Sequence, residues 1–186
     1  MRLGSASFAS ALNIAASLGA LAVGVSVMSR GGSGGADAIA AGVPLLMLGE
    51  GLKILIGLCV ANQVRAVFIL VASPLPLLIG LTAALLMIAA GLLGFGVLLW
   101  PGFRGLAGYI NPLALGGVVI SGLWALSTIA ASRKAPVFPV WLQAVGCFLP
   151  FPPLLSLIFP AAVIVTFLGG LVWNLGLGIE LARRRL

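Results

Sequence analysis

Long uninterrupted runs of apolar residues make up most of this chain, and short polar or glycine- and proline-rich segments separate them. The runs are about 20 residues long, the length that a helix rising ~1.5 Å per residue needs to cross ~30 Å of hydrocarbon. A transmembrane β-barrel would instead show segments of about 10 residues with alternating polarity. The pattern therefore predicts an all-α fold, a polytopic membrane helix bundle.

The breaks between the runs divide the chain into six predicted spans. A glycine-rich segment, 29–35, ends the first span, and the polar segment 62–65 ends the second. Pro74 and Pro76 begin the third, because a helix seldom continues through two such prolines, and they leave 67–72 as a short interfacial or re-entrant piece. The predicted spans are residues 6–28, 38–61, 75–100, 112–131, 139–155 and 160–182, in a single transmembrane domain, 1–186.

The composition agrees with this interpretation. Hydrophobic residues make up 62% of the chain and charged residues 7%, whereas a soluble domain has roughly 45–50% and about 25%. The net charge of +7 arises from basic residues placed singly in short loops and in one terminal run. They form no basic stripe interleaved with polar surface, so we expect no nucleic-acid partner.

The basic residues also predict an orientation, because cytoplasmic loops are enriched in Lys and Arg. Six spans place seven of them on one side and leave Arg30 and Arg104 on the other. The seven are Arg2, Arg65, Arg133, Lys134, Arg183, Arg184 and Arg185. We therefore expect cytoplasmic N and C termini in a multi-pass protein of the cell inner (cytoplasmic) membrane. Five spans would separate Arg2 from the terminal arginines and weaken this bias.

Glu50 and Lys53 lie in the middle of the second predicted span. Ionisable residues are rare in transmembrane helices, because an unpaired charge at the bilayer centre costs at least ~2.5–3.5 kcal/mol. At spacing i, i+3 the two share a helix face and can pair. Two interpretations stay open: a proton, ion or substrate relay, or a neutralised structural pair. We favour the structural pair, because no second carboxylate or histidine is expected nearby.

Depth along the helices predicts further members of this site. Counted from the predicted span ends, Asn13 and Asn174 lie at the level of Lys53, and Gln143 lies closer to the cytoplasmic surface but within reach. The predicted intramembrane polar cluster, structural or relay, is Glu50, Lys53, Asn13, Asn174 and Gln143. Ser10 and Ser17 share a helix face with Asn13, and interhelical hydrogen bonding alone would explain all these residues.

Small and aromatic residues indicate how the helices pack. Small residues recur at four-residue spacing at Ala16, Ala20 and Gly24, and again at Gly117, Ser121 and Ala125. Such faces allow close helix packing, and the expected partners are membrane lipids and other membrane-protein subunits or a second copy of the chain. The large aromatic residues, expected near the headgroup level, are Trp100, Tyr109, Trp124, Trp141 and Trp173.

Several chemistries lack their residues. The chain has no histidine, the commonest ligand of haem, chlorophyll, zinc and copper, so no such cofactor and no metal is indicated. Cys59 and Cys147 have no paired spacing and are expected to pack as small apolar residues. No GxSxG, HExxH, P-loop or paired acidic motif is present. We predict that the chain is not an enzyme, and expect lipids as its bound molecules.

The second half also carries motifs of a known kind. These are Gly122-Leu123-Trp124 before a basic loop, Phe138-Pro139-Val140-Trp141-Leu142, and Val172-Trp173 with Gly178 before a basic tail. In these features, over roughly residues 73–186, the chain resembles a bacterial family of small multi-span membrane proteins catalogued only as a domain of unknown function. The resemblance implies a six-helix fold and gives no substrate, cofactor or reaction.

Three functions compete at this point. The first is a non-catalytic accessory or scaffolding subunit that packs against a larger, for example energy-transducing, membrane complex. The second is a small proton- or ion-coupled transporter or channel that uses Glu50 and Lys53. The third, an enzyme acting on lipid, rests on membrane residence alone. Short loops, close-packing faces and the missing catalytic motifs favour the first.

Overall fold

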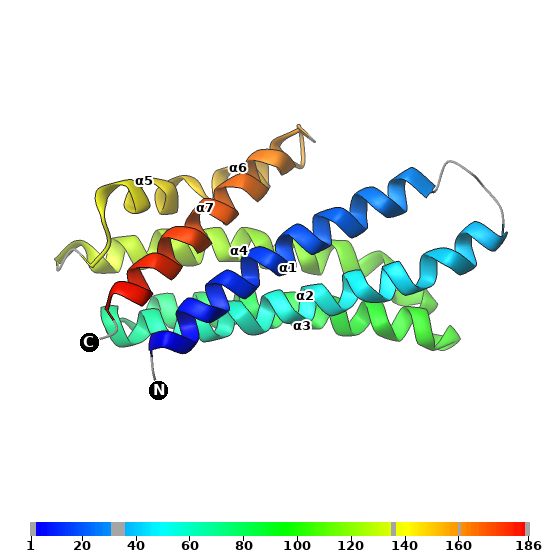
Figure 1. The fold of residues 1–186 in the computed structure, drawn as a ribbon, viewed down its shortest axis with the longest axis horizontal. Helices are drawn as coiled ribbons and strands as arrows, with labels where there is room; N and C mark the ends of the chain where they lie inside the picture. Colours follow the sequence, from blue (N-terminus) through cyan, green and yellow to red (C-terminus); the bar gives the residue numbers. More distant parts are fainter. Residues whose placement is uncertain (1–2, 31–35, 135–136, 160, 185–186) are drawn as a thin grey trace.

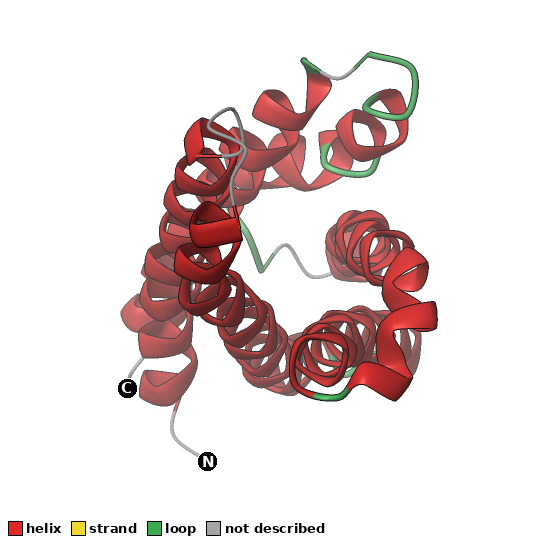
Figure 2. Ribbon diagram, turned by 90° about the vertical axis from the view of Figure 1, so that its right-hand side faces the viewer, coloured by secondary structure: helices red, strands yellow, loops and turns green. Residues whose placement is uncertain are grey.

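The computed structural model describes residues 3–30, 36–134, 137–159 and 161–184, and within these ranges every regular element is a helix (Figures 1 and 2). The elements are α1 (Leu3–Arg30), α2 (Ala36–Val71), α3 (Pro74–Leu99), η2 (Pro101–Tyr109), α4 (Ile110–Ala131), η3 (Ser132–Lys134), α5 (Val140–Phe148), α6 (Phe151–Leu155) and α7 (Ala162–Arg183). In this described part, five helices are long and apolar enough to cross a membrane. The all-helical class is confirmed, and the architecture is that of a membrane protein.

Four helices occupy the positions of predicted spans. Helices α1, α3, α4 and α7 cover the first, third, fourth and sixth, and their ends lie close to the predicted ones. Pro74 occupies the start of α3, where its missing N–H leaves no helical hydrogen bond unmade. Residues 101–109, between the third and fourth predicted spans, form the 3₁₀ helix η2, which is exposed throughout.

The predicted end of the second helix at residue 61 is wrong. Helix α2 continues through the polar segment 62–65 to Val71, and the predicted interfacial piece 67–72 is mostly its last turn. The segment does not break the helix because Gln63 is fully buried and its amide is hydrogen-bonded to neighbouring helices. The chain reverses instead at Ala72, whose φ of 51° lies in the left-handed region.

The fifth predicted span, 139–155, consists of two short helices. Helix α5 has 9 residues and α6 has 5, and a turn at Leu149 and Pro150 separates them. A helix from Val140 to Leu155 would be ~24 Å long at ~1.5 Å per residue, short of the ~30 Å hydrocarbon thickness. In Figure 1 the pair extends along only part of the bundle. The count of six spans therefore stays a prediction.

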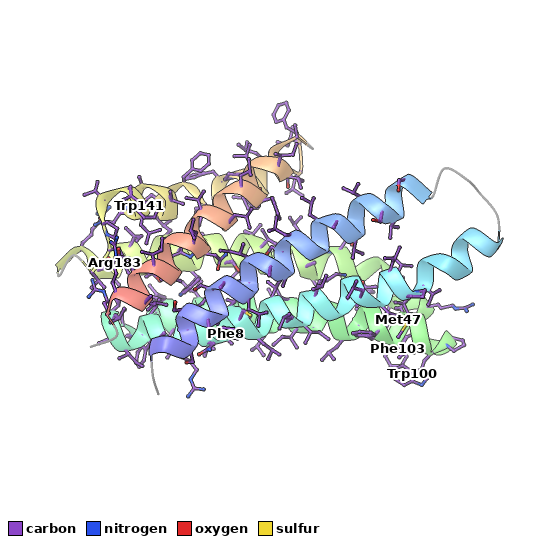
Figure 3. The ribbon with its side chains drawn as sticks, in the orientation of Figure 1. Phe8, Met47, Trp100, Phe103, Trp141 and Arg183 are labelled. Carbon is purple, nitrogen blue, oxygen red and sulfur yellow. The ribbon has the colours of Figure 1, made fainter. Side chains whose placement is uncertain are left out.

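The first and last helices meet at one end of the bundle, where the start of α1 lies beside the end of α7 (Figure 1). We call this the terminal end. Figure 3 shows Trp141 and Arg183 near it, and Trp100 and Phe103 near the opposite end. Trp100, Tyr109 and Trp141 are exposed, as expected for rings at a membrane interface.

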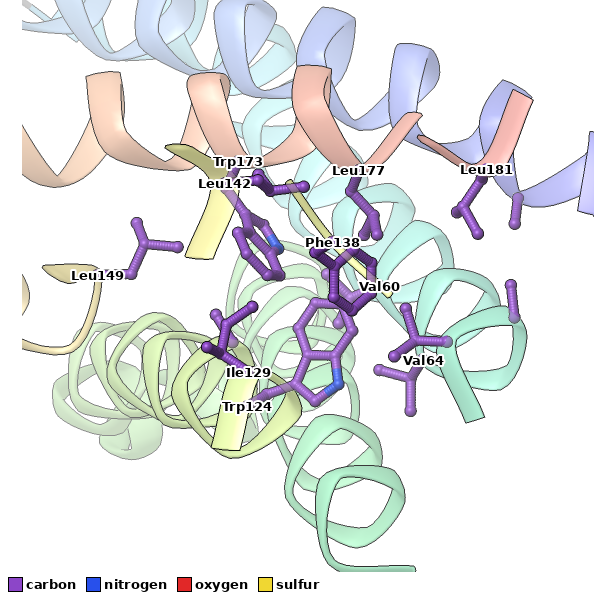
Figure 4. Close-up of a cluster of buried hydrophobic side chains, with 14 of the residues drawn as sticks. Val60, Val64, Trp124, Ile129, Phe138, Leu142, Leu149, Trp173, Leu177 and Leu181 are labelled. Carbon is purple, nitrogen blue, oxygen red and sulfur yellow. The ribbon is translucent and has the colours of Figure 1, made fainter. Parts of the chain in front are cut away.

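Trp124 and Trp173 were expected at an interface but lie in the core, with exposed fractions of 2% and 3%. Their rings pack edge to face with centroids 6.1 Å apart, and Phe138 lies against Trp173 (Figure 4). An aromatic pair of this geometry contributes about 0.5–1.5 kcal/mol beyond its buried area. The buried apolar cluster that contains these rings joins α1, α2, α3, α4, α5 and α7.

Glycines allow α2 and α3 to approach very closely. A Cβ added at Gly57 would lie 2.8 Å from the Ala84 carbonyl oxygen, and one at Gly91 would lie 2.7 Å from the Glu50 carbonyl oxygen. The small-residue face of α4 is used in the same way, because a Cβ at Gly117 would lie 2.8 Å from the Met87 side chain. These small residues therefore serve packing within the chain.

Candidate functional site

Glu50 and Lys53 form a closed ion pair on α2. The Lys53 ammonium donates to both carboxylate oxygens of Glu50, at 2.7 Å each. The Glu50 side chain is 12% exposed and the Lys53 side chain is 21% exposed. Gly94 of α3 makes room for the carboxylate, since a Cβ added there would overlap it. The carboxylate thus lies between its own cation and the backbone of α3.

The other predicted cluster residues do not join this pair. Asn13 accepts a hydrogen bond from Ser17 on its own helix at 3.3 Å. Gln143 donates to the Phe138 carbonyl oxygen at 2.7 Å. Asn174 accepts one from Gln63 at 2.7 Å. The structure therefore separates the ion pair from the other three residues: Gln143 stands apart, whereas Asn13 and Asn174 line one cavity.

The wrong predicted end of α2 explains why Asn13 and Asn174 were grouped with Lys53. The prediction measures the depth of Lys53 from residue 61, whereas α2 ends at Val71, about ten residues or ~15 Å further along. Leu52 in fact packs against Gly19 of α1. Asn13 lies six residues before Gly19, or ~9 Å along α1, too far for a hydrogen bond to Lys53.

A different polar contact joins three helices. Gln63 of α2 donates one hydrogen bond to the Ser10 hydroxyl of α1 at 3.0 Å and another to Asn174 of α7 at 2.7 Å. We call Ser10, Gln63 and Asn174 the amide bridge. Gln63 was missed because its polar neighbours suggested a loop. The signal that could have identified it is helical spacing, because Gln63 lies between the buried residues Val60 and Val67.

Two adjoining cavities lie beside the amide bridge. The smaller, about 130 Å³, has Asn13, Gln63 and Asn174 in its wall. The larger, about 390 Å³, is formed mainly by apolar side chains of α1 and α7, with one residue each from α2, α3 and α4. Both are lined by Ser17, Thr166 and Asn174, so they meet at this point. Together they form a site with a polar end and an apolar end.

Three buried polar atoms near the polar end have no hydrogen-bond partner among the described residues. They are Gln63 Oε1, Trp124 Nε1 and Trp173 Nε1, and all three residues line the smaller cavity. Leaving such a group unpaired costs about 1–3 kcal/mol. Unpaired buried groups therefore gather at this site.

A second ion pair lies at the terminal end. Arg183 donates to the Glu180 carboxylate at 3.1 Å, and the neighbouring Arg184 guanidinium donates to the Val137 carbonyl oxygen. Glu180 is buried although it is close to the end of α7. The Arg184 hydrogen bond fastens the end of α7 to the segment before α5, so the basic end of this helix has a structural role in addition to any role in orientation.

The described residues hold no group of three or more His, Cys, Asp or Glu side chains placed to bind a metal. Cys59 and Cys147 are free thiols. No protein-family model, curated protein or solved structure matches the chain. The family resemblance of residues 73–186 therefore stays a prediction, and function has to be argued from the geometry.

Proposed function

We propose that this chain is a non-catalytic, multi-pass membrane protein that acts as an accessory or scaffolding subunit of a larger membrane complex, with an energy-transducing complex as one candidate. The observation that carries the proposal is the closed Glu50–Lys53 pair. Both carboxylate oxygens accept from the Lys53 ammonium, and the pair is seated against Gly94 of the neighbouring helix.

A relay role would require the carboxylate to exchange protons or ions with a hydrated path. Neither Glu50 nor Lys53 lines the two cavities at the amide bridge or the cavity between the start of α1 and the end of α7. Pairing at i, i+3 leaves the helix with no net charge at this level. The pair is thus suited to holding α2 against α3, and this favours a structural role.

An accessory subunit also needs a surface for its partner. Exposed apolar side chains do not identify one, because lipid tails solvate them as well as a protein would. A surface that allows close packing of helices does identify a partner site, and α1 has a position of this kind. Ala16 is buried inside the chain, whereas Gly24 is exposed and a Cβ added there would meet nothing within 4 Å. The Gly24 end of the small-residue face is therefore open to a helix of another subunit.

The test is purification in mild detergent at native expression, followed by identification of the co-purifying proteins. We expect membrane subunits at fixed stoichiometry. Gly24→Leu should reduce their recovery, because it fills a position where an added Cβ meets nothing within 4 Å. The matched control is Val25→Leu, which changes the size of an already exposed neighbour and should leave recovery unchanged. Recovery of the wild type as a lone monomer would contradict the proposal.

Glu50→Gln separates this role from coupled transport. Under the proposal the variant retains the complex and its activity, because an amide can still accept a hydrogen bond from Lys53. Loss of a proton-driven flux in reconstituted vesicles, with the complex intact, would instead support a transporter or channel that uses the pair.

A further inference from the structure

The cavity pair beside the amide bridge has the form of a small-molecule site. A cavity of about 150 Å³ inside a protein is enough to hold benzene, and the larger of the two has about 390 Å³. The smaller adds about 130 Å³ at the polar end. Together they have room for a hydrocarbon segment with one polar group at its end.

The rim of the larger cavity indicates where a ligand would enter. Leu21 of α1 and Val163 and Ile164 of α7 line it, and all three are exposed on the surface of the bundle. This surface is apolar and belongs to two of the helices long enough to cross a membrane. The cavity therefore opens toward hydrocarbon, and a molecule that already resides in the membrane can reach it.

The hydrogen-bonding groups at the polar end indicate which chemical group of a ligand would bind there. Gln63 Oε1 is an acceptor without a partner among the described residues. Asn13 uses its oxygen to accept from Ser17, and its amide nitrogen donates none of the hydrogen bonds between described residues. A hydroxyl group both donates and accepts. It can therefore donate a hydrogen bond to Gln63 Oε1 and accept one from the Asn13 amide nitrogen. A ketone could only accept, and it would leave Gln63 Oε1 without a donor.

The lining also excludes a charged head group. No Asp, Glu, Lys or Arg is among the described residues that line either cavity. A carboxylate or phosphate placed there would lose its hydration with no cation to compensate, which is strongly unfavourable. A hydrocarbon without a polar group would fill the apolar end but leave Gln63 Oε1 without a hydrogen-bond donor.

We propose that the site between α1, α2, α4 and α7 binds a neutral long-chain alcohol of the membrane, with its hydroxyl group at Gln63 and Asn13 and its chain between Leu21 and Phe167. The inference is independent of the role in a complex, since it depends on the cavities and the amide bridge alone. It assigns this chain a lipid-binding site of defined polarity.

Photolabelling of the wild-type full chain tests it. The protein is reconstituted in phosphatidylcholine vesicles and labelled with a hexadecanol analogue that carries a diazirine in its chain. Hexadecanol, hexadecane and hexadecanoic acid serve as competitors. We expect label on α1 and α7 around Leu21 and Phe167, and competition by the alcohol about fivefold stronger than by the alkane, as the loss of one or two hydrogen bonds implies. Equal competition by the alkane, stronger competition by the acid, or label spread evenly over all lipid-facing helices would overturn the proposal.

Two variants sharpen the result. Ala20 lines the larger cavity, so Ala20→Phe should fill it and abolish the specific label, while Val25→Phe on the outside of the same helix should not. Asn13→Leu should keep the label but remove the preference for alcohol over alkane. Labelling of Ala20→Phe at the wild-type level would contradict the assignment. The competition experiment on the wild type decides the question even where a variant fails to fold.

Discussion

Gly57→Ala tests the close approach of α2 and α3 most directly. The added methyl group would lie 2.8 Å from the Ala84 carbonyl oxygen and 2.7 Å from Ile88 Cγ1. Even weak C–H···O contacts keep carbon and oxygen about 3.3–3.6 Å apart, so the two helices would have to separate by roughly half an ångström or more. The oxygen is a backbone atom and cannot rotate away.

The magnitude follows from two opposing terms. Overpacking of a well-packed interface costs about 1–3 kcal/mol, and contact with a backbone atom places this substitution in the upper part of that range. Alanine exceeds glycine in helix propensity by about 1 kcal/mol. The net expectation is a loss of about 1–2 kcal/mol. Gly24→Ala, where the methyl group meets nothing within 4 Å, lacks the clash and should gain up to about 1 kcal/mol.

The assay is reversible unfolding of the purified chain in mixed micelles with increasing sodium dodecyl sulfate, followed by tryptophan fluorescence and far-ultraviolet circular dichroism. Both variants make the same chemical change, so only the surroundings of the glycine differ. The reasoning would be refuted if Gly57→Ala stabilised the protein as much as Gly24→Ala does.

Three further predictions use the same assay. Lys53→Met should destabilise the protein by about 3 kcal/mol, because it leaves the Glu50 carboxylate without its cation, and adding Glu50→Gln should recover most of this loss. Gly94→Ala should cost about 1–3 kcal/mol in the wild type but little in a Glu50→Ala background, because the three atoms nearest the added methyl group all belong to the Glu50 side chain; equal losses in both backgrounds would show that the carboxylate is not seated there. A double-mutant cycle of Gln63→Leu and Asn174→Leu should give a coupling free energy of about 0.6 kcal/mol and at most ~1.7 kcal/mol, the range for hydrogen bonds between membrane helices. A coupling free energy of zero would show that Gln63 and Asn174 do not stabilise the protein through a shared hydrogen bond.

The apolar runs alone determined most of the secondary structure. A run long enough to cross hydrocarbon can satisfy its backbone polar groups only as a helix or in a closed barrel. The lengths of the runs excluded the barrel, and prolines, glycines and short polar or basic segments marked the ends of α1, α3, α4 and α7. The pairing of Glu50 with Lys53 was also predictable, because spacing i, i+3 on one helix needs no knowledge of any other helix.

The tertiary structure alone decided the rest. Whether Gln63 ends a helix or continues it depends on whether Ser10 and Asn174, distant in sequence, are there to accept its hydrogen bonds. The neighbouring helices likewise decide the depth of Lys53 and the burial of Trp124 and Trp173. They also form the cavities between α1, α2, α4 and α7. A local pattern reports what a segment would do in lipid, but a polar or aromatic side chain responds to its partners, and these become known only when the helices are packed together.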